Sequence, residues 1–148
     1  MSVVPESVVP GSFVSGTEAR RIETPNGVMT TLASPTQGRA GQAVWRVDAK
    51  PGMVGPVHAF DTELVWTWLS GAAVVRLGGE RYEVGPGDTM VLPADVSRQM
   101  YADPEHGFVS VVVASAGARV YNPGGVSDPD ACALAPKATE RLVPLWAR

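Results

Sequence analysis

The side chains that can do chemistry in this sequence are few, and they centre on one histidine. His58 is followed closely by Asp61 and Glu63, and Arg98 lies further along the chain. An imidazole has an ordinary pKa near ~6.5, so it can take or give a proton at neutral pH, and a nearby carboxylate can orient its ring. A guanidinium can anchor a carboxylate, phenolate or carbonyl oxygen. His58 is therefore a candidate acid or base, Glu63 a candidate partner for it, and Arg98 a candidate anchor for an oxyanion.

Each of these residues also has a structural interpretation. His58 can be hydrogen-bonded inside the fold without taking part in a reaction, because buried histidines serve both purposes. Arg98 can form an ion pair with a carboxylate at the rim of the fold, such as Asp61, Glu63 or Asp95. The sequence contains two histidines, so a three-histidine metal site within one chain is excluded.

The elements that position these groups are short apolar runs separated by turns. Between residues 28 and 115, runs rich in Val, Trp, Thr and Tyr alternate with Gly, Pro and Asp. Runs of this length and composition are typical of strands rather than helices. Gly78 and Gly79 stand between two of these runs and can supply the positive φ angles of a tight hairpin turn. The pattern predicts an all-β fold, either a barrel or a sandwich.

The turn residues and His58 also follow the spacing of a known superfamily. The segment from about residue 28 to residue 115 resembles the cupins, whose two motifs run G-x5-H-x-H-x3,4-E-x6-G and G-x5-P-x-G-x2-H-x3-N. The resemblance implies a double-stranded β-helix, or jelly-roll, barrel. The chain keeps Gly52, His58, Gly71, Gly87 and Pro93 of these motifs. In the first motif, Phe60 stands at the second His and Leu64 at the Glu. In the second motif, Asp95 stands at the second Gly, Arg98 at the His and Ala102 at the Asn.

The departures from the motifs fall on the metal ligands. The resemblance implies a divalent transition metal held by two or three imidazoles and a carboxylate. Phe60 and Leu64 cannot coordinate a metal, and the permanent charge of Arg98 repels a dication. We therefore expect no bound metal cofactor. The alternative is a weak divalent-metal site made by His58 and Glu63, which requires a bulge or a late strand start to bring Glu63 to the inner face.

The same positions predict the wall of a cavity. Alternate residues of a strand point to the same face. Residues that lie an even number of positions from a cupin ligand position on the same strand should therefore face the interior. The result is an apolar, aromatic cavity for a small organic molecule, or, alternatively, a barrel that the same rings fill completely. The residues expected inside are His58, Phe60, Leu64, Trp66, Trp68, Arg98 and Met100.

The chain divides into three parts around this barrel. Residues 1–27 form an N-terminal arm with one possible edge strand, residues 28–115 the cupin barrel, and residues 116–148 a tail. Ser127 to Asp130 reads S-D-P-D, which is a helix start, so a short helix is expected in the tail. The final RLVPLWAR is apolar enough to dock on the barrel or on a second subunit. Because the arm and the tail also resemble the strand-exchanging extensions of cupin dimers, we expect a homodimer.

Composition excludes several kinds of partner. The net charge of −3 provides no basic surface for nucleic acid. No stretch approaches the ~20 apolar residues that span a bilayer, so a membrane location is not expected. Cys132 is the single cysteine, so no intrachain disulfide can form. These features agree with a cytoplasmic protein.

Three functions remain open. The first is a metal-independent isomerase, cyclase or lyase that acts on a small organic molecule, with His58 as acid or base and Arg98 as anchor. The second is a non-catalytic barrel that binds or senses a small molecule. The third is a divalent-metal oxygenase that uses His58 and Glu63.

Overall fold

Alternation of buried and exposed residues produces the strands of the computed structural model, which describes residues 11–127 and 132–148. In β5 (Leu64–Gly71), every second residue from Leu64 to Trp68 is buried and those between are partly exposed. This period of two is that of a strand with one face in the core. The other elements are β1 (Arg21–Thr24), β2 (Gly27–Ala33), β3 (Gln42–Ala49), β4 (Ala59–Phe60), β6 (Ala73–Leu77), β7 (Glu80–Val84), β8 (Thr89–Leu92), β9 (Arg98–Ala102), β10 (Phe108–Ser115), β11 (Val120–Tyr121), β12 (Arg141–Leu142) and the 3₁₀ turns η1 (Pro123–Gly125) and η2 (Leu145–Ala147).

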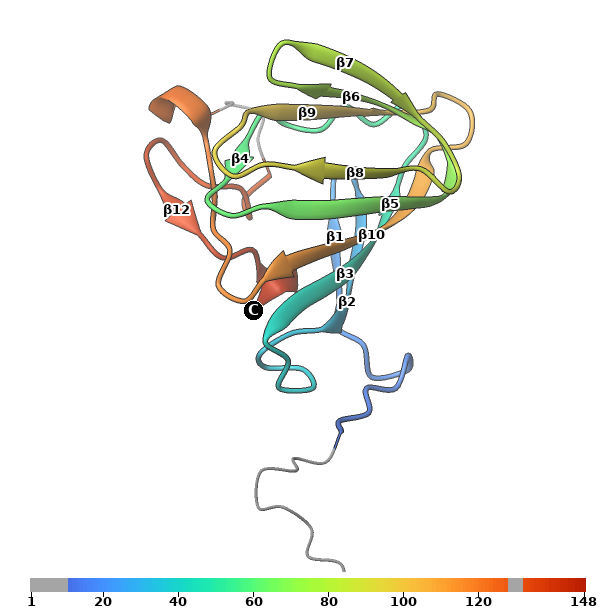
Figure 1. Ribbon diagram of the computed structural model, residues 1–148, viewed down its shortest axis with the longest axis vertical. Coiled ribbons are helices and arrows are strands. Elements are labelled where there is room, and N and C mark those ends of the chain that lie inside the picture. Colours follow the sequence, from blue (N-terminus) through green and yellow to red (C-terminus); the bar gives the residue numbers. More distant parts are fainter. Residues whose placement is uncertain (1–10, 128–131) are drawn as a thin grey trace, which may run out of the picture.

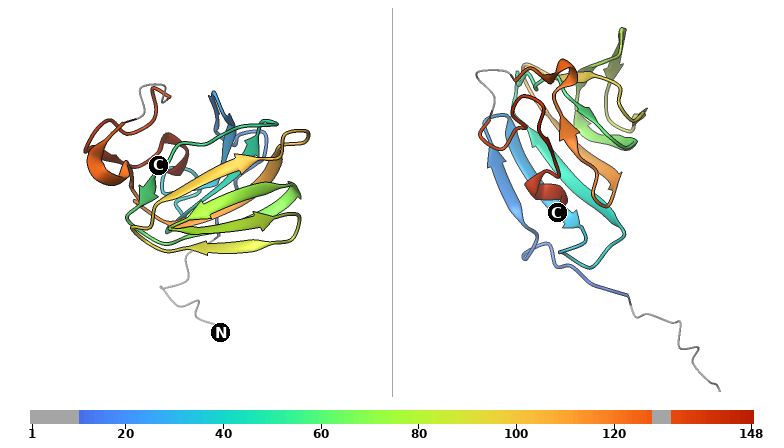
Figure 2. Two further views of the ribbon diagram at one scale, coloured as in Figure 1. Left: turned by 90° about the horizontal axis from the view of Figure 1, so that it is seen from above. Right: turned by 90° about the vertical axis from the view of Figure 1, so that its left-hand side faces the viewer.

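Three antiparallel sheets enclose one interior (Figures 1 and 2). The largest has the order β1-β2-β3-β10-β5-β8, and the smaller two have the orders β7-β6-β9 and β12-β11-β4. Inward-facing side chains from the largest sheet and from the sheet β7-β6-β9 are almost completely buried between these two sheets, among them Trp45, Trp68, Val75 and Val112. The all-β jelly-roll barrel expected from the sequence is confirmed.

Turns at the Gly positions of the cupin motifs hold the strands in place. Gly71 has a φ angle of +72°, and a Cβ atom there would lie 2.1 Å from the carbonyl oxygen of Gly107, so only glycine fits. Asp95 stands where the cupin motif has glycine and keeps a left-handed φ of 62°. Asp tolerates this conformation better than most residues, and its Oδ1 accepts a hydrogen bond of 2.7 Å from the Tyr121 hydroxyl. The turn therefore keeps its shape although the residue differs.

The Gly78-Gly79 hairpin is confirmed, because Leu77 pairs with Glu80 across these two residues. At the N-terminal side, β1 is an edge strand of the large sheet. The helix expected from Ser127 to Asp130 falls mostly outside the described residues, and the described part of the tail has helical structure only as the short turns η1 and η2.

The C-terminal tail packs on the barrel of its own chain. η2 lies against β1, β2 and β3, as the right-hand view of Figure 2 shows. Thr31 Oγ1 donates a hydrogen bond of 2.7 Å to the carbonyl oxygen of Trp146, and Ser34 Oγ donates one of 2.5 Å to that of Arg148. The apolar tail is thus covered without a second subunit, and the homodimer stays a prediction. No helix within residues 11–127 and 132–148 is long and apolar enough to cross a membrane.

Candidate functional site

A cavity of about 130 Å³ lies inside the barrel, between the strands and the C-terminal tail. Its wall is mostly apolar and aromatic, and includes Trp45, Phe60, Trp66, Phe108 and Trp146. Three methionines, Met29, Met53 and Met100, also line it. The strongly polar side chains of the wall are few, namely Thr24, Asn26, His58, Arg98 and Gln99.

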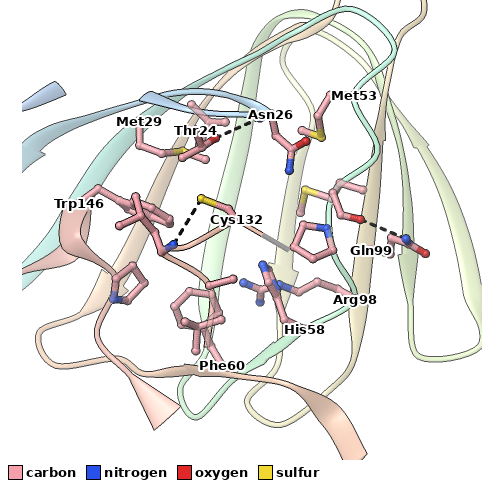
Figure 3. A pocket seen from close by; sticks show the side chains of 18 of the residues that line it. Thr24, Asn26, Met29, Met53, His58, Phe60, Arg98, Gln99, Cys132 and Trp146 are labelled. Carbon is pink, nitrogen blue, oxygen red and sulfur yellow. Dashed lines mark hydrogen bonds between the residues drawn. The ribbon is translucent and has the colours of Figure 1, made fainter. Parts of the chain in front are cut away.

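His58 and Arg98 are paired directly across two backbone segments. The His58 N–H donates to the carbonyl oxygen of Arg98 at 3.1 Å, and the Arg98 N–H donates to that of His58 at 2.9 Å. Directly opposed residues project their side chains on the same side, so the imidazole and the guanidinium are neighbours in the cavity (Figure 3). Phe60 lies beside both. The Cζ atom of Arg98 is 4.4 Å from the centre of the Phe60 ring, and the His58 ring stands at 89° to it with its centre 6.0 Å away.

Three nitrogen atoms, each on a residue that lines the cavity, are buried without a hydrogen-bond partner among the described residues. They are Nδ1 of His58, Nε of Arg98 and Nε1 of Trp66. A buried polar atom left unpaired costs roughly 1–3 kcal/mol, and more if it is charged. These three unpaired groups, all on residues around one small cavity, therefore reduce the stability of the unliganded fold.

The carboxylates expected near these groups have other partners. Asp61 accepts hydrogen bonds from the backbone N–H and from Nε of Arg119, at 2.8 and 3.0 Å. Asp95 accepts from Tyr121. Within the described part of the chain, no carboxylate forms a salt bridge with Arg98. The ion-pair interpretation of Arg98 is therefore not supported, and the guanidinium is an uncompensated cation.

Burial determines the charge state of the pair. Arg98 is only 3% exposed, and this burial lowers its pKa to about 9, so it remains cationic at neutral pH. His58 is half-buried as a residue, but its Nδ1 has no exposed surface. Burial and then the charge of Arg98 lower the pKa of His58 to about 3. At neutral pH the unliganded site presents a cation beside a neutral imidazole.

Comparison with known proteins places this geometry in a family. Residues 48–120, which include His58 and Arg98, match the AraC-like ligand binding domain. The fold is similar to that of an RmlC-like cupin from Shewanella frigidimarina, at 19% identity and a TM-score of 0.60 over 70% of this chain and 88% of that chain. The chain belongs to the cupin superfamily.

Two further cupins of known structure are similar to this chain. Polyketide cyclase RemF from Streptomyces resistomycificus is 20% identical, with a TM-score of 0.67 over 80% of this chain and 87% of that chain. KdgF from Halomonas sp. is 22% identical, with a TM-score of 0.59 over 70% of this chain and 93% of that chain. At these identities the likeness shows a common fold. A comparison with curated proteins gives no match.

The metal-ligand positions of this cupin do not fit a divalent cation. Phe60 and Arg98 take two of them inside the cavity, and the guanidinium places a positive charge beside His58. Glu63 is exposed and precedes the first residue of β5, so it does not join His58 on the inner face. Among the described residues, no group of three or more His, Cys, Asp or Glu side chains could hold a metal ion. The arrangement suits an anion instead.

The predicted cavity residues fall into two groups. His58, Arg98, Phe60, Trp66 and Met100 all line the cavity. Leu64 and Trp68 do not, although both point inward, because each is completely buried in the core. Trp68 stacks on Trp66 with ring centres 5.8 Å apart, so it supports the wall from behind.

Other wall residues were not foreseen from the sequence. Thr24 and Asn26 come from the end of β1 and the following turn, and Cys132, Leu134 and Trp146 come from the tail (Figure 3). The Cys132 Sγ accepts a hydrogen bond of 3.4 Å from the Leu134 N–H. The alternation in β3 was a usable signal for Trp45 and Val47, whereas no local pattern places the tail over the cavity.

Proposed function

We propose that this cupin binds a small organic anion with an apolar body, without a metal, and that Arg98 anchors the charge. The observation that carries the proposal is the set of unpaired polar atoms on His58, Arg98 and Trp66 around an otherwise apolar cavity. A carboxylate, phenolate or enolate would satisfy the guanidinium and neutralise the buried cation. The match to an AraC-like ligand binding domain agrees with a binding role.

The size of the cavity limits the ligand. An engineered protein cavity of roughly 150 Å³ accommodates benzene, and the cavity here measures about 130 Å³. Drug-sized ligands occupy pockets of about 300–1,000 Å³. A single-ring or short-chain carboxylate therefore matches both the volume and the aromatic wall.

His58 has a defined part in such a complex. As a neutral imidazole it carries one N–H donor and one acceptor nitrogen, so it can donate a hydrogen bond to the same anion that Arg98 holds. A bound anion also offsets the charge of Arg98, which is one of the two causes that lower the pKa of His58. Ligand binding should therefore raise the pKa of His58 toward its ordinary value.

The proposal predicts that benzoate binds and that its uncharged analogue benzamide binds much more weakly. A hydrogen bond to a charged group contributes about 1.5–3 kcal/mol, so a roughly tenfold to hundredfold preference for benzoate is expected. Three of the four tryptophans, Trp45, Trp66 and Trp146, line the cavity, so tryptophan fluorescence reports its occupation.

Two variants complete this titration. Arg98→Met should reduce the affinity for benzoate to that for benzamide. Arg76→Gln removes the same charge from an exposed position on the adjacent strand β6 and should change nothing. Equal binding of benzoate and benzamide by the unaltered protein, or loss of binding in both variants, would contradict the proposal.

A second candidate is catalysis on the bound molecule by an isomerase, cyclase or lyase reaction. The position of His58 in the cavity wall favours it, because the imidazole becomes a better base once a bound anion offsets the charge of Arg98. RemF, which shares the fold, is a polyketide cyclase. In that case His58→Gln should retain benzoate binding and abolish turnover of a reactive ligand, whereas unchanged turnover would remove His58 from any reaction.

A further inference from the structure

Asn26 is the polar group of the cavity wall that the anion site leaves unused. The other two polar side chains outside that site are engaged within the fold. Gln99 Nε2 donates to the carbonyl oxygen of Gly55 at 3.1 Å, and Thr24 Oγ1 donates to that of Gly27 at 3.1 Å. The Asn26 carboxamide makes no hydrogen bond with any other described residue. Figure 3 shows it directed into the cavity beside Met53, apart from His58 and Arg98.

The backbone of Asn26 is fixed, and it does not demand asparagine. The Asn26 N–H donates to Thr24 Oγ1 at 3.2 Å, and its carbonyl oxygen accepts a hydrogen bond of 3.1 Å from the Lys50 N–H. Asparagine is common in turns because it tolerates a positive φ angle and can bond its own backbone. Asn26 does neither, because it is not among the residues with positive φ and its side chain makes no such bond. The turn therefore does not account for a carboxamide at this position.

We infer that the ligand has two polar ends, a carboxylate held by Arg98 and a hydroxyl or carbonyl group at the opposite end that hydrogen-bonds to the Asn26 carboxamide. This inference rests on the proposed function and narrows its ligand class to hydroxy- or oxo-substituted small carboxylates. The rest of the cavity wall is mostly apolar, with Met29, Met53 and Phe108 among its residues, so the body of the ligand is apolar. A carboxamide is both a donor and an acceptor, and it can bind either kind of group.

Three ligands of nearly the same size test this inference by calorimetric titration at pH 7. They are benzoate, 4-methylbenzoate and 4-hydroxybenzoate, of which the last two differ by a methyl and a hydroxyl group of similar volume. A neutral hydrogen bond corresponds to roughly a threefold to tenfold difference in affinity. The protein should prefer 4-hydroxybenzoate over 4-methylbenzoate by about this factor.

Asn26→Leu, which keeps the shape of the side chain, should abolish this preference and leave benzoate binding within about twofold. Met53→Leu, on the same side of the cavity, should affect the three ligands equally. Asn26→Ser is a second variant if Asn26→Leu folds poorly, since its shorter side chain does not reach as far. A purely structural role for Asn26 would change all affinities together and would not change their ratio.

The outcomes separate this inference from the proposed function. If the ligands bind through Arg98 but the protein does not prefer 4-hydroxybenzoate, or if the preference persists in Asn26→Leu, the role of Asn26 is wrong and the anion site stands. If no ligand binds, or if Arg98→Met binds all three as well as the unaltered protein does, both ideas are wrong.

Discussion

Replacing Arg98 with Met is expected to stabilise the fold while it removes the proposed anion site. Arg98 is 3% exposed, and its guanidinium has no carboxylate partner within the described residues and an unpaired Nε. Met has a similar length and no polar atom to desolvate. Replacing a buried ion pair by apolar residues of similar volume is often neutral or stabilises a protein by about 1–4 kcal/mol, and an unpaired buried cation lacks even the partner charge that offsets its desolvation. The lost contact with Phe60 offsets roughly 0.5–2 kcal/mol of this gain, so a rise toward the lower half of that range is expected.

Urea unfolding at pH 7 measures the effect. The backbone bonds between residues 58 and 98 do not depend on the side chain, so they should persist in Arg98→Met. Arg76→Gln, at an exposed site, should change the free energy of unfolding by less than about 0.5 kcal/mol. Destabilisation by Arg98→Met would show that the guanidinium has a stabilising partner, and the interpretation of Arg98 as an uncompensated ligand anchor would be wrong.

The second large effect is a loss of stability in mild acid that is caused by one histidine. Burial, with the charge of Arg98, lowers the pKa of His58 from 6.5 to about 3 in the folded protein. Above pH 6.5 the residue is neutral in both states and has no effect. Between pH 6.5 and about 3 the unfolded chain binds a proton that the folded chain does not, so stability falls as the pH falls. The loss is on the order of 1.4 kcal/mol per pH unit, or about 2 kcal/mol between pH 6.5 and pH 5.

In His58→Gln, the slope of the unfolding free energy against pH should be smaller by about 1.4 kcal/mol per pH unit between pH 6.5 and about 3. His106→Gln is the matched control, because His106 is the other histidine of the chain and its side chain is 75% exposed. Proton–nitrogen NMR of the two imidazoles gives an independent check, since the His58 ring should remain neutral at pH 5. An ordinary titration of His58 near pH 6.5, with the same acid slope in both variants, would show that the imidazole is solvated.

The sequence was sufficient to predict the face on which each barrel residue lies. The period of two in a strand puts Phe60, Trp66 and Met100 on the inner side, and the motif spacing pairs His58 with Arg98. The same parity put Leu64 and Trp68 in the predicted wall, yet both are part of the solid core. The alternation along a strand determines to which face a side chain points. The packing of neighbouring strands determines whether that side chain contacts the cavity or other core atoms.

The residues that distant segments contribute to the cavity wall could not be predicted from the sequence. The apolar tail was expected to dock, but only the fold shows that Trp146 lines the cavity and that Asn26 faces it from the β1–β2 turn. The lowered pKa of His58 could not be predicted from the sequence either. An imidazole with its ordinary pKa was a reasonable expectation for a catalyst, and the desolvation that lowers this pKa depends on the complete packing around it.

The fold and the chemistry of this cupin thus separate. Gly71 and the left-handed Asp95 preserve the turns of the barrel, whereas two positions at which the cupin motifs have metal ligands hold Phe60 and Arg98, with the guanidinium over the aromatic ring. In the proposal, the positive charge that a metal supplies elsewhere in the family comes from Arg98. Burying a charged side chain lowers the stability of the fold. Arg98→Met should therefore raise the free energy of unfolding while it lowers the affinity for an anion.

The most direct test of this account is a calorimetric titration of chelator-treated protein with benzoate. The account predicts binding that is unaffected by the chelator, reduced at least roughly tenfold in Arg98→Met, and unchanged in Arg76→Gln. Binding that appears only after a divalent metal is restored, or that is equal in Arg98→Met and the unaltered protein, would contradict it.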